Sequence, residues 1–176
     1  MQILVIRHGH AVDDAPGLGD EARWLSGKGR KVTRRVAAWL AKRDERRPGA
    51  IWTSSLVRAV QTAEILAEAA GLTDEISVLG ELAPESAPGD LVKRLAAYSG
   101  AQPLALVGHE PHLSSFTALL FGPGATDAEL RLKKSGVISL TWDGQGPAML
   151  RFLLDPKEMS VTTELPSADD RPRSSG

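Results

Sequence analysis

The chain alternates between short uninterrupted apolar runs and longer segments whose apolar residues recur at helical spacing. Residues 3–6 form the first run, an aliphatic and β-branched stretch typical of a strand covered on both faces. Residues 28–43 then place apolar side chains on one helical face and Arg and Lys on the other. The pattern predicts a buried strand followed by an amphipathic helix, with Ser26 as the N-cap of that helix.

The alternation of strand and helix continues as far as residue 120. Residues 50–53 are predicted to form a strand, and the next helix runs to residue 70, capped by Ser54 or Ser55 and closed by Gly71. The later elements are predicted as strands over 76–79 and 103–107 and helices over 90–98 and 111–120. This order indicates an α/β sandwich with a largely parallel sheet.

The last part of the chain departs from this order. Residues 137–142 and 148–154 are apolar runs separated by a Gly-rich stretch, which predicts a β-hairpin. The fold class is therefore α/β, a three-layer αβα sandwich whose mostly parallel sheet has an antiparallel edge. Residues 1–155 are expected to form the domain, and residues 156–176, rich in Ser, Pro, Asp and Arg, a loosely ordered C-terminal tail.

The composition narrows the class of protein. At 176 residues with 42% hydrophobic side chains, the chain suits one domain with one sizeable core. The formal net charge of -1 leaves no overall field to gather nucleic acid or an anionic membrane, so we expect neither as a partner. The absence of cysteine excludes disulfides and cysteine nucleophiles. With no apolar run as long as a signal peptide or membrane span, we expect a cytoplasmic monomer.

Chemically versatile side chains stand directly after two of the predicted strands. Residues 7–10 read Arg-His-Gly-His after the first strand, and residues 108–111 read Gly-His-Glu-Pro after the fourth. Arg58 lies near the start of the helix that follows the second strand. Ligands of open α/β sheets bind at the carboxyl ends of the strands. If the first and fourth strands are neighbours, these groups converge on one pocket.

Such a pocket suits a phosphoryl group in transfer, whose negative charge is spread over three oxygens. The planar forks of Arg7 and Arg58 can each donate two parallel hydrogen bonds to such oxygens. A neutral imidazole such as that of His8 is a good nucleophile near pH 7 without a separate base. Gly9 would let the backbone approach the ligand closely.

Three motifs together resemble the histidine phosphatase, or phosphoglycerate mutase-like, superfamily: Arg-His-Gly at residues 7–9, Ser-Ser-Leu-Val-Arg-Ala-Val-Gln-Thr at residues 54–62, and Gly-His-Glu-Pro at residues 108–111. The small size and the segment Arg-Trp-Leu-Ser-Gly-Lys-Gly at residues 23–29 are similar to the SixA-type phosphohistidine phosphatases. The resemblance implies a phosphoglycerate mutase-like fold and a phosphatase. Its substrate would be a phosphohistidine on a signalling protein or, alternatively, a small phosphate ester.

The resemblance also implies a role for each site residue. His8 becomes phosphorylated, while Arg7, Arg58 and His109 hold the phosphoryl oxygens and water then hydrolyses the phosphohistidine. Arg23 would close over the bound group. An ester leaving group also needs a proton, and the carboxyl group of Glu81, placed just after the third predicted strand, is the candidate donor.

Two other kinds of protein fit some of these residues. Four histidines could form a metal site, with His8 and His10 as a His-x-His pair, but neither a carboxylate run nor a His-Glu-x-x-His helix completes it. We therefore expect no metal and no cofactor, and we place His10 and His112 at the border of the pocket. The remaining alternative is a phosphate-binding module without turnover.

Basic side chains are concentrated in and just after the first predicted helix: Lys28, Arg30, Lys31, Arg34, Arg35, Lys42, Arg43, Arg46 and Arg47. A solvated helix face is the ordinary explanation of such a run. The sharper hypothesis is a docking surface for an acidic phosphorylated protein domain, in which case charge reversal at Arg34 and Arg35 should slow turnover of a phosphoprotein at low salt.

Overall fold

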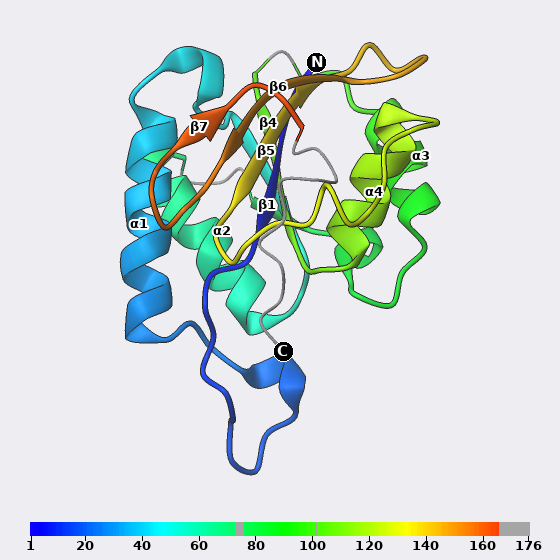
Figure 1. The fold of residues 1–176 in the computed structure, drawn as a ribbon. Coiled ribbons are helices and arrows are strands. Elements are labelled where there is room, and N and C mark those ends of the chain that lie inside the picture. The colour runs from blue at the N-terminus through cyan, green and yellow to red at the C-terminus, as the bar shows by residue number, and fades with distance from the viewer. Residues whose placement is uncertain (73–75, 101, 166–176) are drawn as a thin grey trace, which may run out of the picture.

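The computed structural model describes residues 1–72, 76–100 and 102–165, and strands alternate with helices through most of that length (Figure 1). The strands are β1 (Gln2–Arg7), β2 (Ala50–Thr53), β3 (Ile76–Val78), β4 (Leu104–Gly108), β5 (Val137–Thr141), β6 (Met149–Leu154) and β7 (Val161–Thr162). The α-helices are α1 (Gly27–Ala41), α2 (Val57–Ala70), α3 (Pro88–Ala96) and α4 (His112–Phe121). Short 3-10 helices lie at η1 (Asp20–Ala22), η2 (Asp44–Arg46) and η3 (Gly80–Leu82).

The seven strands form one sheet in the order β3-β2-β4-β1-β5-β6-β7. The pairs from β3 to β1 are parallel, whereas β5, β6 and β7 each run antiparallel to the preceding strand in that order. The sheet therefore has a parallel core and an antiparallel side, as the sequence predicts. The pairing of β1 with β4 sets Arg7 opposite Gly108, so the polar residues after these two strands start from the same level.

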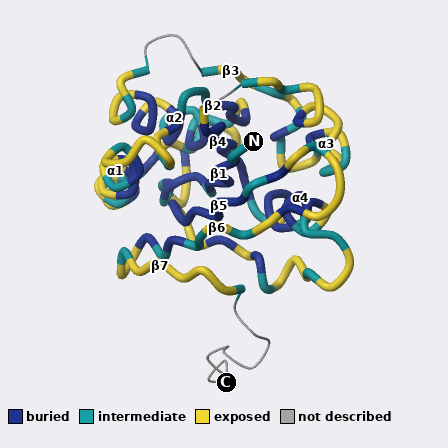
Figure 2. Tube along the Cα trace, turned by 90° about the horizontal axis from the view of Figure 1, so that it is seen from above, coloured by how far each residue is buried: buried dark blue, intermediate teal, exposed yellow. Residues whose placement is uncertain are grey.

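Helices cover both faces of the sheet, with α1 and α2 on one side and α3 and α4 on the other (Figures 1 and 2). Alternate residues of a strand point to opposite faces, so β1 contributes to both cores. Ile3 and Val5 pack in the core beneath α3 and α4, and Leu4 and Ile6 in the core beneath α1 and α2. This two-sided burial explains why the first apolar run of the chain is uninterrupted.

The ends of the helices agree with the sequence at two of three positions. Ser26 is the N-cap of α1 and accepts a hydrogen bond from a backbone N–H of the first turn. Gly71 closes α2 with φ +76°, a conformation that favours glycine. The prediction that Ser54 or Ser55 caps α2 is wrong, because Leu56 occupies the N-cap and makes no side-chain cap bond.

The sheet continues beyond the expected end of the domain at residue 155. Strand β7 pairs with β6, and Leu165 packs against the core beneath α3 and α4. The guanidinium of Arg35 on α1 donates to the carbonyls of Pro156 and Lys157, which fixes the turn before β7. Residues 166–176 of the expected tail lie outside the described residues. Among the helices of the described part, none is long and apolar enough to cross a membrane.

Candidate active site

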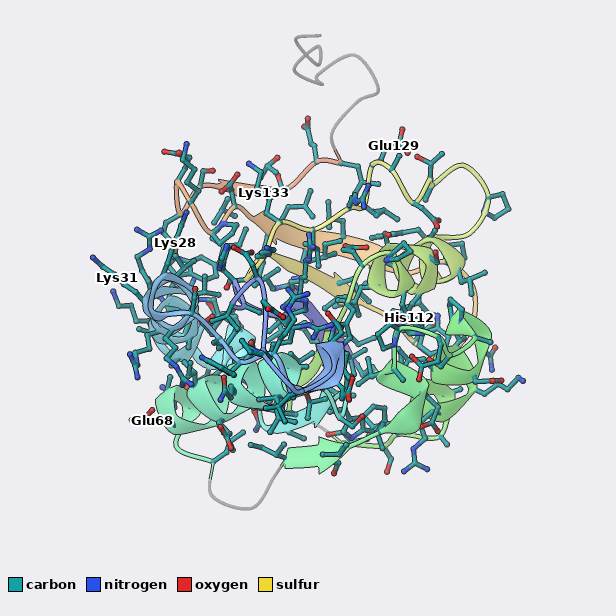
Figure 3. The ribbon with its side chains drawn as sticks, turned by 90° about the horizontal axis from the view of Figure 1, so that it is seen from below. Lys28, Lys31, Glu68, His112, Glu129 and Lys133 are labelled. Carbon is teal, nitrogen blue, oxygen red and sulfur yellow. The ribbon has the colours of Figure 1, made fainter. Side chains whose placement is uncertain are left out.

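His8 and His109 meet at the carboxyl ends of the neighbouring strands β1 and β4. The backbone N–H of His8 donates to the carbonyl of Gly108 at 3.0 Å, and the two imidazole rings lie with their centroids 4.9 Å apart. Figure 3 looks onto this end of the molecule. The prediction that the two histidines converge is confirmed, and it follows from the pairing of β1 with β4.

The imidazole of His8 is held in one orientation and one tautomer. Its Nδ1 lies 2.7 Å from the carbonyl oxygen of Gly9, and a carbonyl can only accept, so Nδ1 carries the proton. Nε2 is then the unprotonated nitrogen. Burial of the ring is the main reason that the pKa of His8 falls to about 4, and the charges of Arg58 and Arg7 lower it further. His8 is therefore neutral near pH 7, with Nε2 available as a nucleophile.

His109 is also buried and neutral, and Ser54 holds its ring. The Nε2 atom of His109 lies 2.9 Å from the hydroxyl of Ser54, while its Nδ1 is buried without a hydrogen-bond partner. Burial, followed by the charges of His8 and Arg58, lowers the pKa of His109 to about 3. A buried polar atom without a partner costs stability. The unpartnered Nδ1 is therefore a position at which a ligand oxygen can replace the missing bond.

Arg58 brings a buried cation from the first turn of α2 to these histidines. Only 7% of the residue is exposed, and its buried guanidinium is paired with Asp20. Nη2 donates to Oδ2 of Asp20 and Nη1 donates to the backbone carbonyl of Asp20, both at 2.7 Å. Arg58 is the main reason that the pKa of Asp20 is lowered. One residue of η1 thus holds both terminal nitrogens of this guanidinium.

Arg23 joins the same cluster from the other side of Asp20. Its Nη1 donates to Oδ1 of Asp20 at 2.6 Å, and its Nε donates to the carbonyl of Val12 at 2.8 Å. The Asp20 carboxylate therefore bridges Arg23 and Arg58, with one oxygen on each. The structure places Arg23 beside the site through this bridge, in the loop between β1 and α1.

Arg7 lies on the opposite side of the histidines and links the site to the segment before β5. Its Nη1 donates to the carbonyl of Leu132 at 2.9 Å, and its Nε is buried without a partner. The carboxylate of Glu110 accepts the backbone N–H of Leu132 at 2.7 Å and the hydroxyl of Ser114 at 2.6 Å. Burial lowers the pKa of Arg7 and the charge of Glu110 opposes this. Glu110 therefore supports the half-buried cation of Arg7.

Gly9 is held on both its N–H and its carbonyl by contacts within the protein. Its N–H donates a hydrogen bond to the hydroxyl of Thr62 at 3.0 Å, and its carbonyl accepts a hydrogen bond from Nδ1 of His8. A side chain on Gly9 would begin 2.5 Å from the hydroxyl of Thr33. The close approach of Thr33 on α1 to this loop explains why a glycine stands here.

The other two histidines serve the loops around the site. Nδ1 of His10 lies 2.9 Å from the hydroxyl of Ser26, at the start of α1. Nε2 of His112 lies 3.1 Å from the hydroxyl of Ser86, which in turn donates to the backbone carbonyl of Glu81. Within the described residues, no three histidine or carboxylate side chains gather where they could hold a metal. Two of the four histidines therefore form a close pair, and the other two each bind a serine in a neighbouring loop.

Several residues of this network carry no signal that marks them in the sequence. The hydroxyl of Thr62 accepts a hydrogen bond from the N–H of Gly9 and donates one to the carbonyl of Arg58, which ties the loop after β1 to α2. Asp20 lies in a polar loop without periodicity. Their roles depend on which segments fold together, whereas the histidines are marked by their place at strand ends.

Comparison with known proteins agrees with this geometry. The sequence profile of the histidine phosphatase superfamily (branch 1) matches residues 3–83, which include the segments of His8 and Arg58. An uncharacterized protein of Picosynechococcus sp. is 41% identical over 143 residues, which cover 80% of this chain and 84% of that protein.

Solved structures give the same picture for the fold. The protein histidine phosphatase SixA, solved in complex with tungstate, is 27% identical, with 91% of this chain and 100% of that chain covered and a TM-score of 0.81. A SixA phosphohistidine phosphatase candidate from Agrobacterium tumefaciens is 26% identical, with 88% and 97% covered and a TM-score of 0.75.

Proposed function

Because this chain belongs to the histidine phosphatase superfamily, we propose that it is a phosphatase that acts through a covalent phosphohistidine formed on His8. The observation that carries the proposal is the hydrogen bond from Nδ1 of His8 to the carbonyl of Gly9. This bond fixes the proton on Nδ1 and leaves the Nε2 lone pair for attack. The neighbouring SixA structure, which holds the oxyanion tungstate, supports a site for a tetrahedral anion.

In the first step, the Nε2 lone pair of His8 forms a bond to phosphorus. The bond from phosphorus to the leaving group breaks, and its electron pair goes to the leaving group. Arg7, Arg58 and His109 would hold the phosphoryl oxygens, with the unpartnered Nδ1 of His109 as one donor. The carbonyl of Gly9 stabilises the positive charge that the phosphorylated imidazole gains.

In the second step, water attacks the phosphorus of the phosphorylated His8. The phosphorus–nitrogen bond breaks, its electron pair returns to Nε2, and the proton that the water loses passes to another oxygen of the inorganic phosphate that forms. Arg23 lies next to Arg58 through Asp20, and we assign it to closing the site over the bound group. No step in this sequence requires a redox change.

We propose phosphohistidine on a protein as the substrate, because its leaving group needs little help. A protonated phosphohistidine breaks to a neutral imidazole, whereas an ester releases an alkoxide that needs a proton. The carboxylates built into this cluster are acceptors: Asp20 has a lowered pKa and binds two arginines, and Glu110 accepts three hydrogen bonds. Neither is suited to donate a proton, which favours the phosphohistidine.

Hydrolysis of small phosphate esters is the second candidate function, and Glu81 favours it. Within the described residues, the Glu81 carboxylate makes no hydrogen bond or ion pair, so it is free to carry a proton to an ester oxygen. The loop that holds it is tied to α4 through Ser86 and His112. A higher kcat/KM on sugar or nucleotide phosphates than on a phosphohistidine peptide would select this alternative.

Trapping of the intermediate tests the proposal. The protein is mixed with a phosphohistidine peptide that carries a radiolabelled phosphoryl group, quenched in alkali and analysed for bound label. We expect label that is stable in base and lost in acid, present in the wild type and in His10→Asn and absent in His8→Asn. The His10 variant is the matched control because that side chain binds Ser26 outside the histidine pair.

The competing interpretations give different results in the same assay. A phosphate-binding module would bind vanadate but carry no label. A metal-dependent hydrolase would lose activity with a chelator and recover it with zinc, whereas the proposed enzyme keeps its activity with chelator and is inhibited by vanadate. Equal labelling of wild type and His8→Asn would refute the assignment of His8 as nucleophile.

A further inference from the structure

The first half of α1 carries cations that the fold does not use. Lys28, Arg30, Lys31 and Arg34, here called the basic face of α1, make no side-chain hydrogen bond or ion pair in the part of the chain that the structure describes. The helix contains no acidic residue. Its N-terminal end is also where a positive charge is unfavourable, because the helix dipole is positive there. These charges therefore do not stabilise the helix.

Arg35 is excluded from this set, although the sequence groups it with Arg34. Its guanidinium donates to the carbonyls of Pro156 and Lys157 and so holds the chain before β7. A charge reversal at Arg35 would disturb that contact and confuse a binding test with a folding defect. The basic face is thus limited to cations that have no structural task.

The opposite side of α1 packs directly on the loop that carries His8. A Cβ added to Gly29 would lie 2.0 Å from the carbonyl oxygen of His10, and the N–H of Ser26 donates to that carbonyl at 2.9 Å. The first turn of α1 therefore lies against the loop two residues after His8. Figure 3 shows Lys28 and Lys31 on the outer side of α1 at this end of the molecule.

An exposed aromatic side chain shortly precedes this basic face in the chain. Trp24, three residues before α1 begins, is 41% exposed. Its backbone is fixed, since its carbonyl accepts the N–H of Val12 at 2.9 Å and the next residue, Leu25, pairs with Ala11. Tryptophan and arginine are enriched at the centres of protein interfaces. A rigidly carried indole next to cations is therefore suited to contact a protein.

We propose that the basic face of α1 and Trp24 form a docking surface for an acidic protein that carries the phosphoryl group to His8. The proposal rests on the proposed function and names its substrate as a protein with acidic residues around the phosphorylated histidine. A small ester fills only the pocket and has no use for a surface outside it. An acidic partner is complementary in charge to four cations without partners, which speeds encounter and fixes orientation.

Two matched phosphohistidine peptides test this inference. One has Asp and Glu around the phosphohistidine, and the other has Asn and Gln at the same positions. The enzymes compared are wild type, Lys28→Glu/Lys31→Glu, and Lys42→Glu/Arg43→Glu. The last variant makes the same charge change just past the C-terminal end of α1, about 20 Å from its first turn at a rise of about 1.5 Å per residue. Each is assayed for kcat/KM at low and high salt, with p-nitrophenyl phosphate as the small substrate.

We expect the wild type to prefer the acidic peptide by at least about tenfold at low salt, and high salt to reduce the preference. The Lys28→Glu/Lys31→Glu variant should lose the preference and keep its activity on p-nitrophenyl phosphate. Its midpoint of thermal unfolding should not fall, since the new charges suit the helix dipole. The variant at residues 42 and 43 should keep the wild-type preference for the acidic peptide. Trp24→Ala should raise KM for the two peptides and leave KM for p-nitrophenyl phosphate unchanged.

An unchanged preference in Lys28→Glu/Lys31→Glu overturns the docking surface. So does an equal loss in the two double variants, because the effect would then come from net charge. If wild type hydrolyses p-nitrophenyl phosphate but neither peptide, the docking surface and the phosphohistidine substrate both fail, while phosphorylation of His8 stands. Absence of label on His8 from any of these substrates would instead refute the proposed function.

Discussion

The proton affinity of His8 decides whether it can act as a nucleophile, and the structure gives that affinity a magnitude. Its pKa of about 4, against an ordinary value of 6.5, corresponds to a free energy of about 3 kcal/mol against the imidazolium form. At about pH 5.5 this leaves roughly 97% of His8 neutral, where an ordinary imidazole would be roughly 9% neutral. Lowering the pH of the solution to about 5.5 therefore distinguishes His8 from an ordinary imidazole.

NMR of the protein with nitrogen-labelled imidazoles measures this directly. We expect the signals of His8, identified by their loss in His8→Asn, to show a proton on Nδ1 and to titrate near pH 4. The protein unfolded in guanidinium provides the control, with histidines that titrate near about 6.5. A midpoint near the ordinary value in the folded protein, or a proton on Nε2, would refute the assignment of His8 as a neutral nucleophile.

The same shift fixes the sign of acid stability. The folded pKa values of His8 and His109 are depressed, so above about pH 6.5 both states carry neutral imidazoles and stability is complete. Below that pH the unfolded chain binds protons that the folded protein does not, and the free energy of unfolding falls by about 1.4 kcal/mol per histidine and pH unit. Urea unfolding at about pH 7 and pH 5 measures this, and equal values would contradict the burial argument.

Two further predictions concern groups that hold the site. Gly29→Ala should lower the free energy of unfolding by at least about 1–3 kcal/mol, since its Cβ would meet the backbone of His10, whereas Gly27→Ala, which meets nothing within 4 Å, should not lower it. Thr62→Val should leave the buried N–H of Gly9 without an acceptor, lowering kcat and costing about 1–3 kcal/mol, while Thr62→Ser should not. Thermal unfolding and steady-state kinetics check both, and equal effects within either pair would contradict the stated contacts.

The sequence reveals the histidine pair because strand ends are visible in it. Four apolar residues before His8 and before His109 indicate buried strands, and parallel strands deliver their next residues to one edge. Sequence also marks Ser26 and Gly71, whose roles are local. Elements of this kind are predictable because each depends on its own few residues.

Residues whose role depends on a distant partner are not visible in this way. Ser54 is a good helix cap by type, but its hydroxyl lies at Nε2 of His109, 55 residues away in the chain, and Leu56 takes the cap position. Strand β7 was unpredictable for the same reason, because its two residues become a strand only by pairing with β6. Local composition carries no record of either pairing.

The cations of the site act on both the anion and the nucleophile. Arg58 and Arg7 lower the pKa of His8, so the charges that receive a phosphoryl group also keep the attacking nitrogen free of a proton. A bound dianion offsets those charges and so raises the proton affinity of His109. This suits the role of His109 as a hydrogen-bond donor to a phosphoryl oxygen. Neutral histidines in the free protein are therefore consistent with one imidazole attacking and the other donating, even though both are buried at the same strand ends.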